Sequence, residues 1–275
     1  EISAVVVCCH GGPGEDGSLQ AMFDLAGVRY TGPSQSGAAL GMDKLAFSGV
    51  MEAAGVSSLP LHLVTDDLLL NEVGPFIVKP RFGGSSIGIE IVENLETANA
   101  LTRTQPLLRE GAVIQRYLSD AIDLNISVRT YPEISLSAIE RPLRPADNGI
   151  YSYADKYLSG SEGMASAPRE LPAELPAHVE RQLRTLASQV IELAMVRSVA
   201  RIDFLWNPDG LWVNEINTIP GSLSWYFWHQ EGIPFARLLT EMVQEATENP
   251  VKGFRTDGAD GSALRDVGAI AHKLA

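Results

Sequence analysis

Residues 199–221 read VARIDFLWNPDGLWVNEINTIPG, and this stretch holds the clearest strand pair in the chain. Alternating apolar and polar residues predict strands over Val199–Trp206 and Leu211–Asn217. The turn between them suits a three-residue hairpin loop, because proline leads a type I turn and glycine accepts the left-handed conformation. That loop predicts three cross-strand pairs: Asn207 with Leu211, Asp203 with Glu215, and Arg201 with Asn217.

Polar side chains then share one face of this pair, because residues two apart on a strand point the same way. They are Arg201, Asp203, Glu215 and Asn217, while Ile202, Phe204 and Ile216 face the core. Two carboxylates and an amide oxygen form a hard-oxygen site that suits magnesium carrying nucleotide phosphates. The neighbouring arginine could stabilise charge that develops during phosphoryl transfer. A solvated sheet face with cross-strand salt bridges is the alternative for an isolated hairpin.

A second candidate site follows the predicted strand Phe76–Pro80, which carries Lys79 near its end. The run Gly83-Gly84-Ser85-Ser86-Ile87-Gly88 comes next, and its glycines would let backbone amides approach a polyphosphate. Lysine supplies the compensating charge. The run lacks the ending of a Walker A loop and is not a dinucleotide-binding fingerprint, so alone it could be a flexible loop.

Composition limits the class of protein. The chain has 275 residues, 45% of them hydrophobic, so we expect a large core and two or three domains. A net charge of −13 argues against a nucleic-acid partner. No apolar run approaches the ~20 residues that cross a bilayer, and no signal peptide is recognisable. We therefore expect a cytoplasmic protein without a membrane or nucleic-acid partner.

Other segments carry weaker predictions. We expect a buried strand over Ile2–Cys9, with Cys8 and Cys9 as small core residues in a reducing compartment rather than a disulfide. Helices are predicted over Gly41–Ala54 and around Val179–Leu193, and antiparallel strands over Leu124–Thr130 and Ile134–Glu140. Residues 141–176 are predicted to be a long polar loop of the kind that usually has a function.

A series of motifs occurs in one order along the chain: His10–Gly17, Tyr30–Gly32, Met42–Lys44, Val78–Pro80 with Gly84–Gly88, Tyr151–Tyr157, Arg201–Asp203 and Glu215–Gly221. In this order they resemble the D-alanine–D-alanine ligases of the ATP-grasp superfamily. The likeness covers roughly residues 5–245, and the ordered set is far more specific than any one motif.

The resemblance implies an α+β and α/β architecture, in which an ATP-grasp fold holds nucleotide between two α+β lobes after a partial N-terminal α/β domain. We accordingly assign residues 1–43 to a remnant of the N-terminal substrate-binding domain and 44–123 to the central lobe. Residues 124–248 form the C-terminal lobe with lid loop and metal site, and 249–275 a tail with a terminal helix. The resemblance also implies small-molecule carboxylate and amine substrates, an acyl phosphate formed from ATP, and a homodimer.

The resemblance assigns a role to each candidate residue. The catalytic set is Arg201, the Gly221 amide, Ser86 and Tyr153. The ATP-binding set is Lys44, Lys79, Ser85, Ser86, Gln115, Arg116, Leu118, Asp123 and Lys156. Asp203, Glu215 and Asn217 would hold two magnesium ions, for which manganese can substitute. The second-substrate pocket would be formed by Ser222, Ser224 and Tyr226.

The chain departs from the family pattern in ways that leave alternatives open. The family's ammonium-binding glutamate lies in a unit that precedes this chain, and Glu15 is not its equivalent. Gln115-Arg116 replaces a glutamate and a basic residue at the adenine hinge, and Asp123 matches the ribose-binding acid after a shift of one residue. The aromatic run Trp225–Trp228 follows Pro220-Gly221, where core packing competes with a pocket shaped for another substrate. A ligase making another dipeptide or amide, a carboxylate kinase that stops at the acyl phosphate, and a non-catalytic nucleotide-binding scaffold therefore remain as alternatives.

Overall fold

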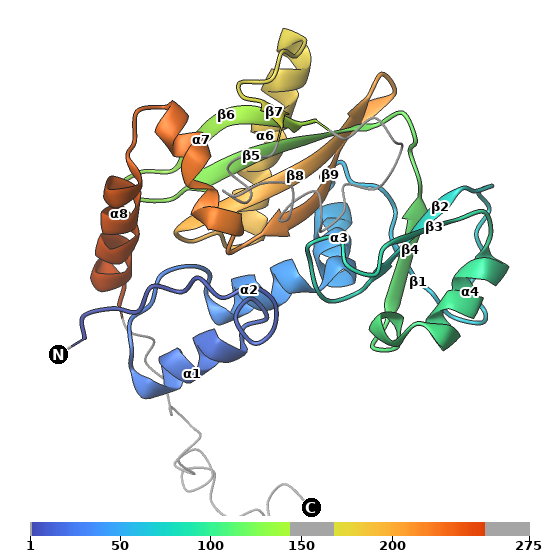
Figure 1. Ribbon diagram of the computed structural model, residues 1–275, viewed down its shortest axis with the longest axis horizontal. Coiled ribbons are helices and arrows are strands. Elements are labelled where there is room, and N and C mark those ends of the chain that lie inside the picture. Colours follow the sequence, from blue (N-terminus) through green and yellow to red (C-terminus); the bar gives the residue numbers. More distant parts are fainter. Residues whose placement is uncertain (1, 144–167, 251–275) are drawn as a thin grey trace, which may run out of the picture.

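The computed structural model describes residues 2–143 and 168–250 of the chain. They form two antiparallel sheets with helices packed beside them (Figure 1). The smaller sheet has the strand order β1-β4-β2-β3, and the larger has the order β7-β6-β5-β8-β9. The helix predicted in the C-terminal tail and the loop motif Tyr151–Tyr157 both lie outside the described residues.

The strands are β1 (His62–Leu63), β2 (Phe76–Pro80), β3 (Glu90–Val92), β4 (Ala112–Arg116), β5 (Ile122–Arg129), β6 (Ser135–Pro142), β7 (Arg169–Glu170), β8 (Val199–Asn207) and β9 (Gly210–Asn217). The helices are α1 (Ser18–Ala26), α2 (Gln35–Met42), α3 (Lys44–Ala53), α4 (Leu95–Thr104), α6 (Ala177–Leu193), α7 (Trp225–Gln230) and α8 (Phe235–Glu248), with 3₁₀ turns η1 (Pro106–Leu108) and η3 (Gly221–Ser224). These bounds confirm the predicted strands around residues 76–80, 124–130, 134–140, 199–206 and 211–217 and the helix ending at Leu193.

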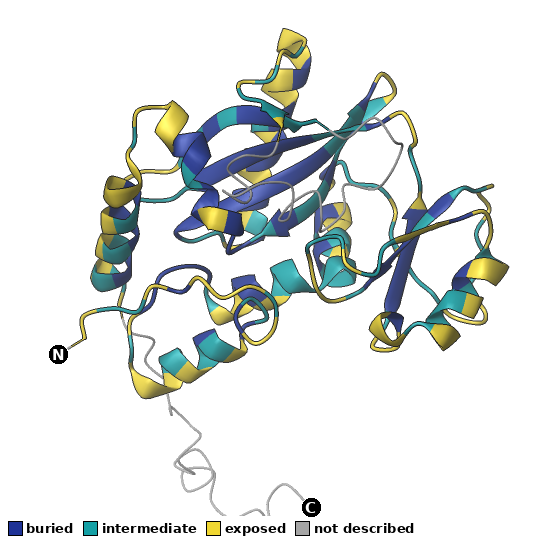
Figure 2. Ribbon diagram, in the orientation of Figure 1, coloured by how far each residue is buried: buried dark blue, intermediate teal, exposed yellow. Residues whose placement is uncertain are grey.

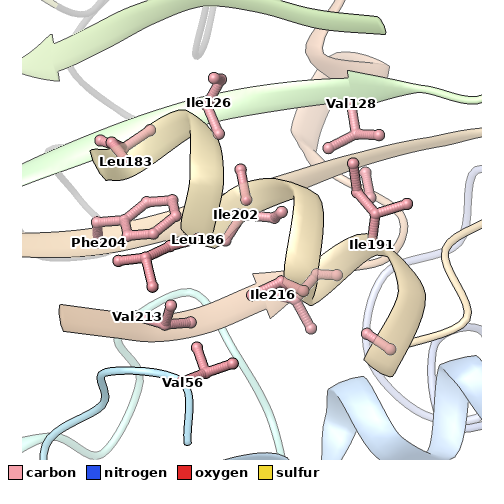
Figure 3. Packing of buried hydrophobic residues seen from close by; sticks show 14 of the residues in the cluster. Val56, Ile126, Val128, Leu183, Leu186, Ile191, Ile202, Phe204, Val213 and Ile216 are labelled. Atoms are coloured by element: carbon pink, nitrogen blue, oxygen red, sulfur yellow. The ribbon is translucent and has the colours of Figure 1, made fainter. Parts of the chain in front are cut away.

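One face of the larger sheet is packed against α6 and α3. The apolar positions of α6, spaced three and four apart, bury Leu183, Leu186 and Val190 against the sheet (Figure 3). Ile202 and Phe204 of β8 meet them from the sheet side, as the alternation of that strand predicts. Because side chains alternate along a strand, the polar residues of the same strands are left on the opposite face.

The smaller sheet has its own apolar core. Phe76 and Val78 of β2 pack with Ala98 of α4 and Leu108 of η1. Figure 2 shows that β5 and β8 of the larger sheet are mostly buried, whereas α4 has an exposed outer side. Separate cores agree with two lobes, and the proposed boundaries at residues 44, 124 and 249 stay a prediction.

The prediction for residues 2–9 is wrong. This segment makes only an isolated parallel bridge from Val5 to Tyr30, and Val7 is its sole buried residue. Cys8 and Cys9 are both exposed free thiols, so they are not core residues. The apolar composition predicted burial, but burial of a strand needs other elements packed against both of its faces, and most of residues 2–9 remain exposed or half-buried.

The predicted single helix over Gly41–Ala54 is also wrong, because Asp43 divides it into α2 and α3. Its backbone is extended, and its carboxylate caps α3 by accepting from the amides of Leu45 and Ala46, each at 3.1 Å. Arg81 donates to the same carboxylate at 2.8 Å and 2.5 Å. Burial raises the pKa of Asp43, but these hydrogen bonds outweigh burial and hold the pKa below its usual value.

Replacing Asp43 with alanine is expected to lower the free energy of unfolding by about 1–2 kcal/mol, measured by urea denaturation at pH 7. Because folding lowers this pKa, the stabilisation is complete above the unfolded-state pKa of about 3.9 and is lost as pH falls through the folded-state pKa. The difference from wild type should therefore shrink below pH 4. Asp66→Ala is the control, since its salt bridge to Arg103 is exposed. An equal loss in both variants would contradict the capping role.

No described helix is long and apolar enough to cross a membrane.

Candidate active site

A cavity of about 640 Å³ lies between the two sheets. Lys79 of β2, Gln115 of β4 and the Gly83–Ile87 loop line it on the side of the smaller sheet. Polar residues of β5, β6, β8 and β9 line it on the side of the larger sheet. One face of each sheet is occupied by its core, so the opposite faces form the cavity wall, which carries both polar and apolar side chains.

A row of polar side chains crosses the larger sheet at one level. The register pairs Glu140 with Asn125, Asn125 with Asp203, and Asp203 with Glu215. All of these residues line the cavity. The register confirms the predicted pairs Asp203–Glu215 and Arg201–Asn217. Residues far apart in sequence therefore form one continuous polar wall.

The predicted hairpin loop is wrong, although the pairing it led to is right. Asn207 pairs with Gly210 rather than Leu211, so the loop has only two residues between the paired positions. The Asn207 side chain favours this tighter turn by accepting from the amides of Asp209 and Gly210. A register shift between Asp203 and Phe204 then restores the predicted pairs. This bulge brings Asn214 as well as Glu215 to the cavity wall.

Arg201 and Asp203 form a buried, bidentate ion pair. Nε and Nη2 of the guanidinium donate to the two carboxylate oxygens, each at 2.7 Å. Burial lowers the pKa of Arg201, but the Asp203 carboxylate more than compensates and raises the pKa. Asn217 Nδ2 also donates to Asp203 Oδ2 at 3.0 Å. The pair keeps a charged arginine on the same wall as the predicted metal ligands.

The donor set of Asp203, Glu215 and Asn217 fits a hard divalent cation. Carboxylate and amide oxygens are the ligands that Mg²⁺ prefers. Among the described residues, no three His, Cys, Asp or Glu side chains converge as a metal site. The predicted set consists of two carboxylates and one amide.

Lys79 lies where the two sheets approach each other. Its Nζ donates to Gln115 Oε1 at 3.4 Å within the smaller sheet and to Asn214 Oδ1 of β9 at 3.2 Å. Only 6% of Lys79 is exposed. Asn214 was not among the predicted residues, because the bulge that turns it into the cavity has no recognisable local signal.

Because the resemblance implies that this cavity binds ATP, replacing Asn214 with leucine is expected to raise the KM for ATP about tenfold, with a smaller change in kcat. The variant removes a hydrogen bond to a charged group that lines the cavity, and such bonds contribute about 1.5–3 kcal/mol. Steady-state kinetics of ADP release would measure it. Trp212→Leu is the matched control, because Trp212 lies on the same strand and does not line the cavity. Equal KM values for wild type and Asn214→Leu would show that the hydrogen bond from Lys79 to Asn214 does not position Lys79 for ATP.

The predicted phosphate loop borders the cavity through Gly83, Gly84, Ser85 and Ser86. Ser85 and Ser86 both have a φ of 58°, a left-handed conformation that non-glycine residues adopt at some cost. Lys44 does not itself line the cavity, but its Nζ donates to the carbonyl of Gly83. The loop is thus tied to the start of α3.

The predicted nucleoside residues lie together. Gln115, Arg116, Leu118 and Asp123 line the cavity at the connection from β4 to β5. Tyr153 and Lys156 lie outside the described residues.

The predicted second-substrate residues are only partly brought together. Tyr226 lines the cavity, as does Gly221 of the predicted catalytic set, whereas Ser222 is exposed and Ser224 is fully buried, and neither serine lines it. Left-handed φ values at residues 222–224 turn the chain so that these serines point elsewhere. Core packing is confirmed for Phe227 and Trp228, which are completely buried. Burial raises the pKa of Tyr226 well above its ordinary value, so its phenol stays neutral.

The cavity is also lined by polar residues that the sequence analysis did not predict. Among them are His10, Glu15, Asn125, Glu140 and Arg169. Glu140 is 3% exposed and accepts from Asn125 at 3.0 Å and from Arg169 at 2.9 Å. Burial raises the pKa of Glu140, against the opposing effect of Arg169. The alternation within β6 could have indicated the face of the sheet to which Glu140 points. It could not have indicated that Glu140 and Asp203 lie in one row across the sheet, on either side of Asn125.

Two α+β lobes that enclose a cavity between their sheets define an ATP-grasp fold. A solved structure of D-alanyl-alanine synthetase A from Vibrio cholerae is 25% identical, with a TM-score of 0.78 over 90% of this chain and 78% of that one. A D-alanine–D-alanine ligase from Bacillus anthracis complexed with ATP, 21% identical, shares the fold with a TM-score of 0.71 over 89% of this chain and 79% of that one.

The sequence comparisons identify the family. A sequence model described as D-ala D-ala ligase C-terminus matches residues 38–244. D-alanine–D-alanine ligases from Arthrobacter sp. (strain FB24) and Prochlorococcus marinus (strain MIT 9313) are 32% and 35% identical, over 88% and 87% of this chain. The chain spans 67% and 71% of the lengths of these relatives. It belongs to the D-alanine–D-alanine ligase family, whose members are ATP-dependent ligases that form a carbon–nitrogen bond.

Proposed function

We propose that this chain joins the carboxylate of one amino acid to the amine of another, using ATP and magnesium, with D-alanine as both substrates. The observation that carries the proposal is the cavity in which Lys79 faces a polar wall containing Arg201, Asp203 and Glu215. A wall of carboxylates opposite a buried lysine suits a polyphosphate held with a divalent cation. The relative from Bacillus anthracis, which shares the fold, was solved with ATP.

The nucleotide would be held from both lobes. Lys79 would supply positive charge toward the phosphates, and Ser85 and Ser86 would provide donors from the loop that follows β2. Lys44 would act on the phosphates through this loop, because its Nζ donates to the carbonyl of Gly83. Gln115 would accept a hydrogen bond from the adenine amine through its side-chain carbonyl. Arg116, Leu118 and Asp123 lie beside it on the cavity wall and complete the proposed nucleoside site.

The proposed reaction transfers the terminal phosphoryl group of ATP to a substrate carboxylate, and the second substrate's amine then displaces phosphate from the acyl phosphate. Magnesium bound by Asp203, Glu215 and Asn217 would neutralise charge on the phosphates. Arg201 is held in place by Asp203 and would stabilise negative charge that develops on the transferred group. The Gly221 amide, at the cavity wall, would donate to the oxyanion formed when the amine attacks.

Measurement of ADP release tests the proposal. Wild type would be assayed with ATP, magnesium and D-alanine alone, and then with a panel of amino acids, beside Glu215→Gln. Turnover with D-alanine that the variant lacks would support the full assignment. Turnover with only another carboxylate–amine pair would overturn D-alanine as substrate. Absence of ADP release with every pair would overturn the ligase function of this chain.

A ligase that makes a different dipeptide is the second candidate. The bulky ring of Tyr226 lines the cavity near Gly221 and reduces the room for the amine-bearing substrate. Product analysis by mass spectrometry across the same panel separates the two candidates. We also expect a homodimer, which light scattering of the purified protein would test.

A further inference from the structure

An arginine that no predicted motif contains lies in the corner of the cavity beside Tyr226. The guanidinium carbon of Arg169 lies 4.1 Å from the centroid of the Tyr226 ring, within the range of a cation–π contact. Nη1 of Arg169 also donates to Glu140 Oε1 at 2.9 Å. Glu140 in turn is held by Asn125 through its other oxygen. These contacts fix a rigid, planar cation in the cavity wall.

The electrostatics of this corner explain what such a cation could do. Glu140, Asp203 and Glu215 all line the cavity, and each would repel an entering carboxylate. Arg201 directs Nε and Nη2 at Asp203, and the proposed function already assigns it to the transferred phosphoryl group. The guanidinium of Arg169 is planar and permanently charged, a shape and charge that match a carboxylate, and it lines the same cavity.

We propose that Arg169, held by Glu140 and Tyr226, binds the carboxylate of the amine-bearing substrate and so determines specificity for a free amino acid over its amide. The inference rests on the proposed function, because it concerns the second substrate of that reaction. It assigns a specificity-determining role to Arg169 and positioning roles to Glu140 and Tyr226. Gly221 and Arg201 line the same cavity, so the carboxylate would be bound within the cavity that contains the proposed reaction site.

Competition between two amine substrates tests the inference directly. Wild type and Arg169→Gln would each receive ATP, magnesium and D-alanine together with D-alaninamide, which has no carboxylate and can act only as the amine substrate. Mass spectrometry would give the ratio of dipeptide to dipeptide amide. Any difference in the intrinsic reactivity of the two amines is the same for both proteins and cancels. Arg141→Gln is the matched control, because Arg141 forms the adjacent β6–β7 salt bridge with Glu170 but does not line the cavity.

We expect the acid-to-amide product ratio to fall about 10- to 100-fold in Arg169→Gln, as for the loss of a hydrogen bond to a charged group. Arg141→Gln should keep the wild-type ratio. Arg169→Lys retains the positive charge but lacks the planar guanidinium, so it should give an intermediate ratio. If Arg169→Gln does not fold, the ratio measured for Arg169→Lys tests the inference instead. A merely structural role would reduce both products together, and an unchanged ratio would overturn the inference alone. Absence of ADP release from wild type would instead overturn the proposed function and this inference with it.

Discussion

Glu215→Gln is expected to reduce the rate of ADP release about 1,000-fold while leaving the protein folded. Glu215 lies opposite Asp203 on the cavity wall, where the proposed cation would be held. The substitution keeps the shape of the side chain and removes its charge, so the loss falls on the electrostatic stabilisation of phosphoryl transfer. A coupled assay of ADP formation at saturating ATP and magnesium would measure the rate.

Asp209→Asn provides the matched control for this variant. Asp209 is an exposed carboxylate in the turn of the same hairpin, and it does not line the cavity. We expect it to retain wild-type activity, and both variants to unfold close to the wild-type temperature. ADP release by Glu215→Gln within tenfold of wild type would show that this carboxylate does not hold the catalytic cation.

Phe204→Ala is expected to cause the largest loss of stability, about 3–5 kcal/mol in the free energy of unfolding. Phe204 is 1% exposed and packs with residues of α6 behind the sheet (Figure 3). Truncation removes a large apolar surface from the core and leaves a cavity that the sheet and helix cannot fill by collapsing. For a chain of this size the melting temperature should fall by about 6–20 °C, measured by circular dichroism.

Phe235→Ala separates this core effect from the mere loss of an aromatic ring. Phe235 is 42% exposed at the start of α8, so much of its surface already contacts solvent. Its loss should therefore cost less than half as much. Equal changes in melting temperature for the two variants would contradict the assignment of Phe204 to the central core.

Several parts of the fold follow from local patterns in the sequence. The alternation along β8 and β9 correctly separated Ile202, Phe204 and Ile216 from the cavity face, because side chains of a strand alternate outside the bulge. The spacing in α6 likewise predicted its buried stripe. Local patterns failed where a contact or a cap decided the outcome. Cys8 has apolar neighbours in the sequence, but it is exposed because no element among the described residues packs over it. The predicted helix over Gly41–Ala54 is interrupted at Asp43, which caps the start of α3.

The sequence by itself determined the order of the motifs, the two faces of the central hairpin and, through these, the family. Only the tertiary structure decided which distant side chains meet: Lys79 with Asn214, and Glu140 with both Asn125 and Arg169. The physical reason is that two different things place a side chain. The face of the sheet to which it points follows from the local period of two residues along its strand. The residues that lie beside it on neighbouring strands depend on the register between strands that are remote in the chain. One bulge in β9 was sufficient to move Asn214 into the cavity, and no local pattern announces such a shift.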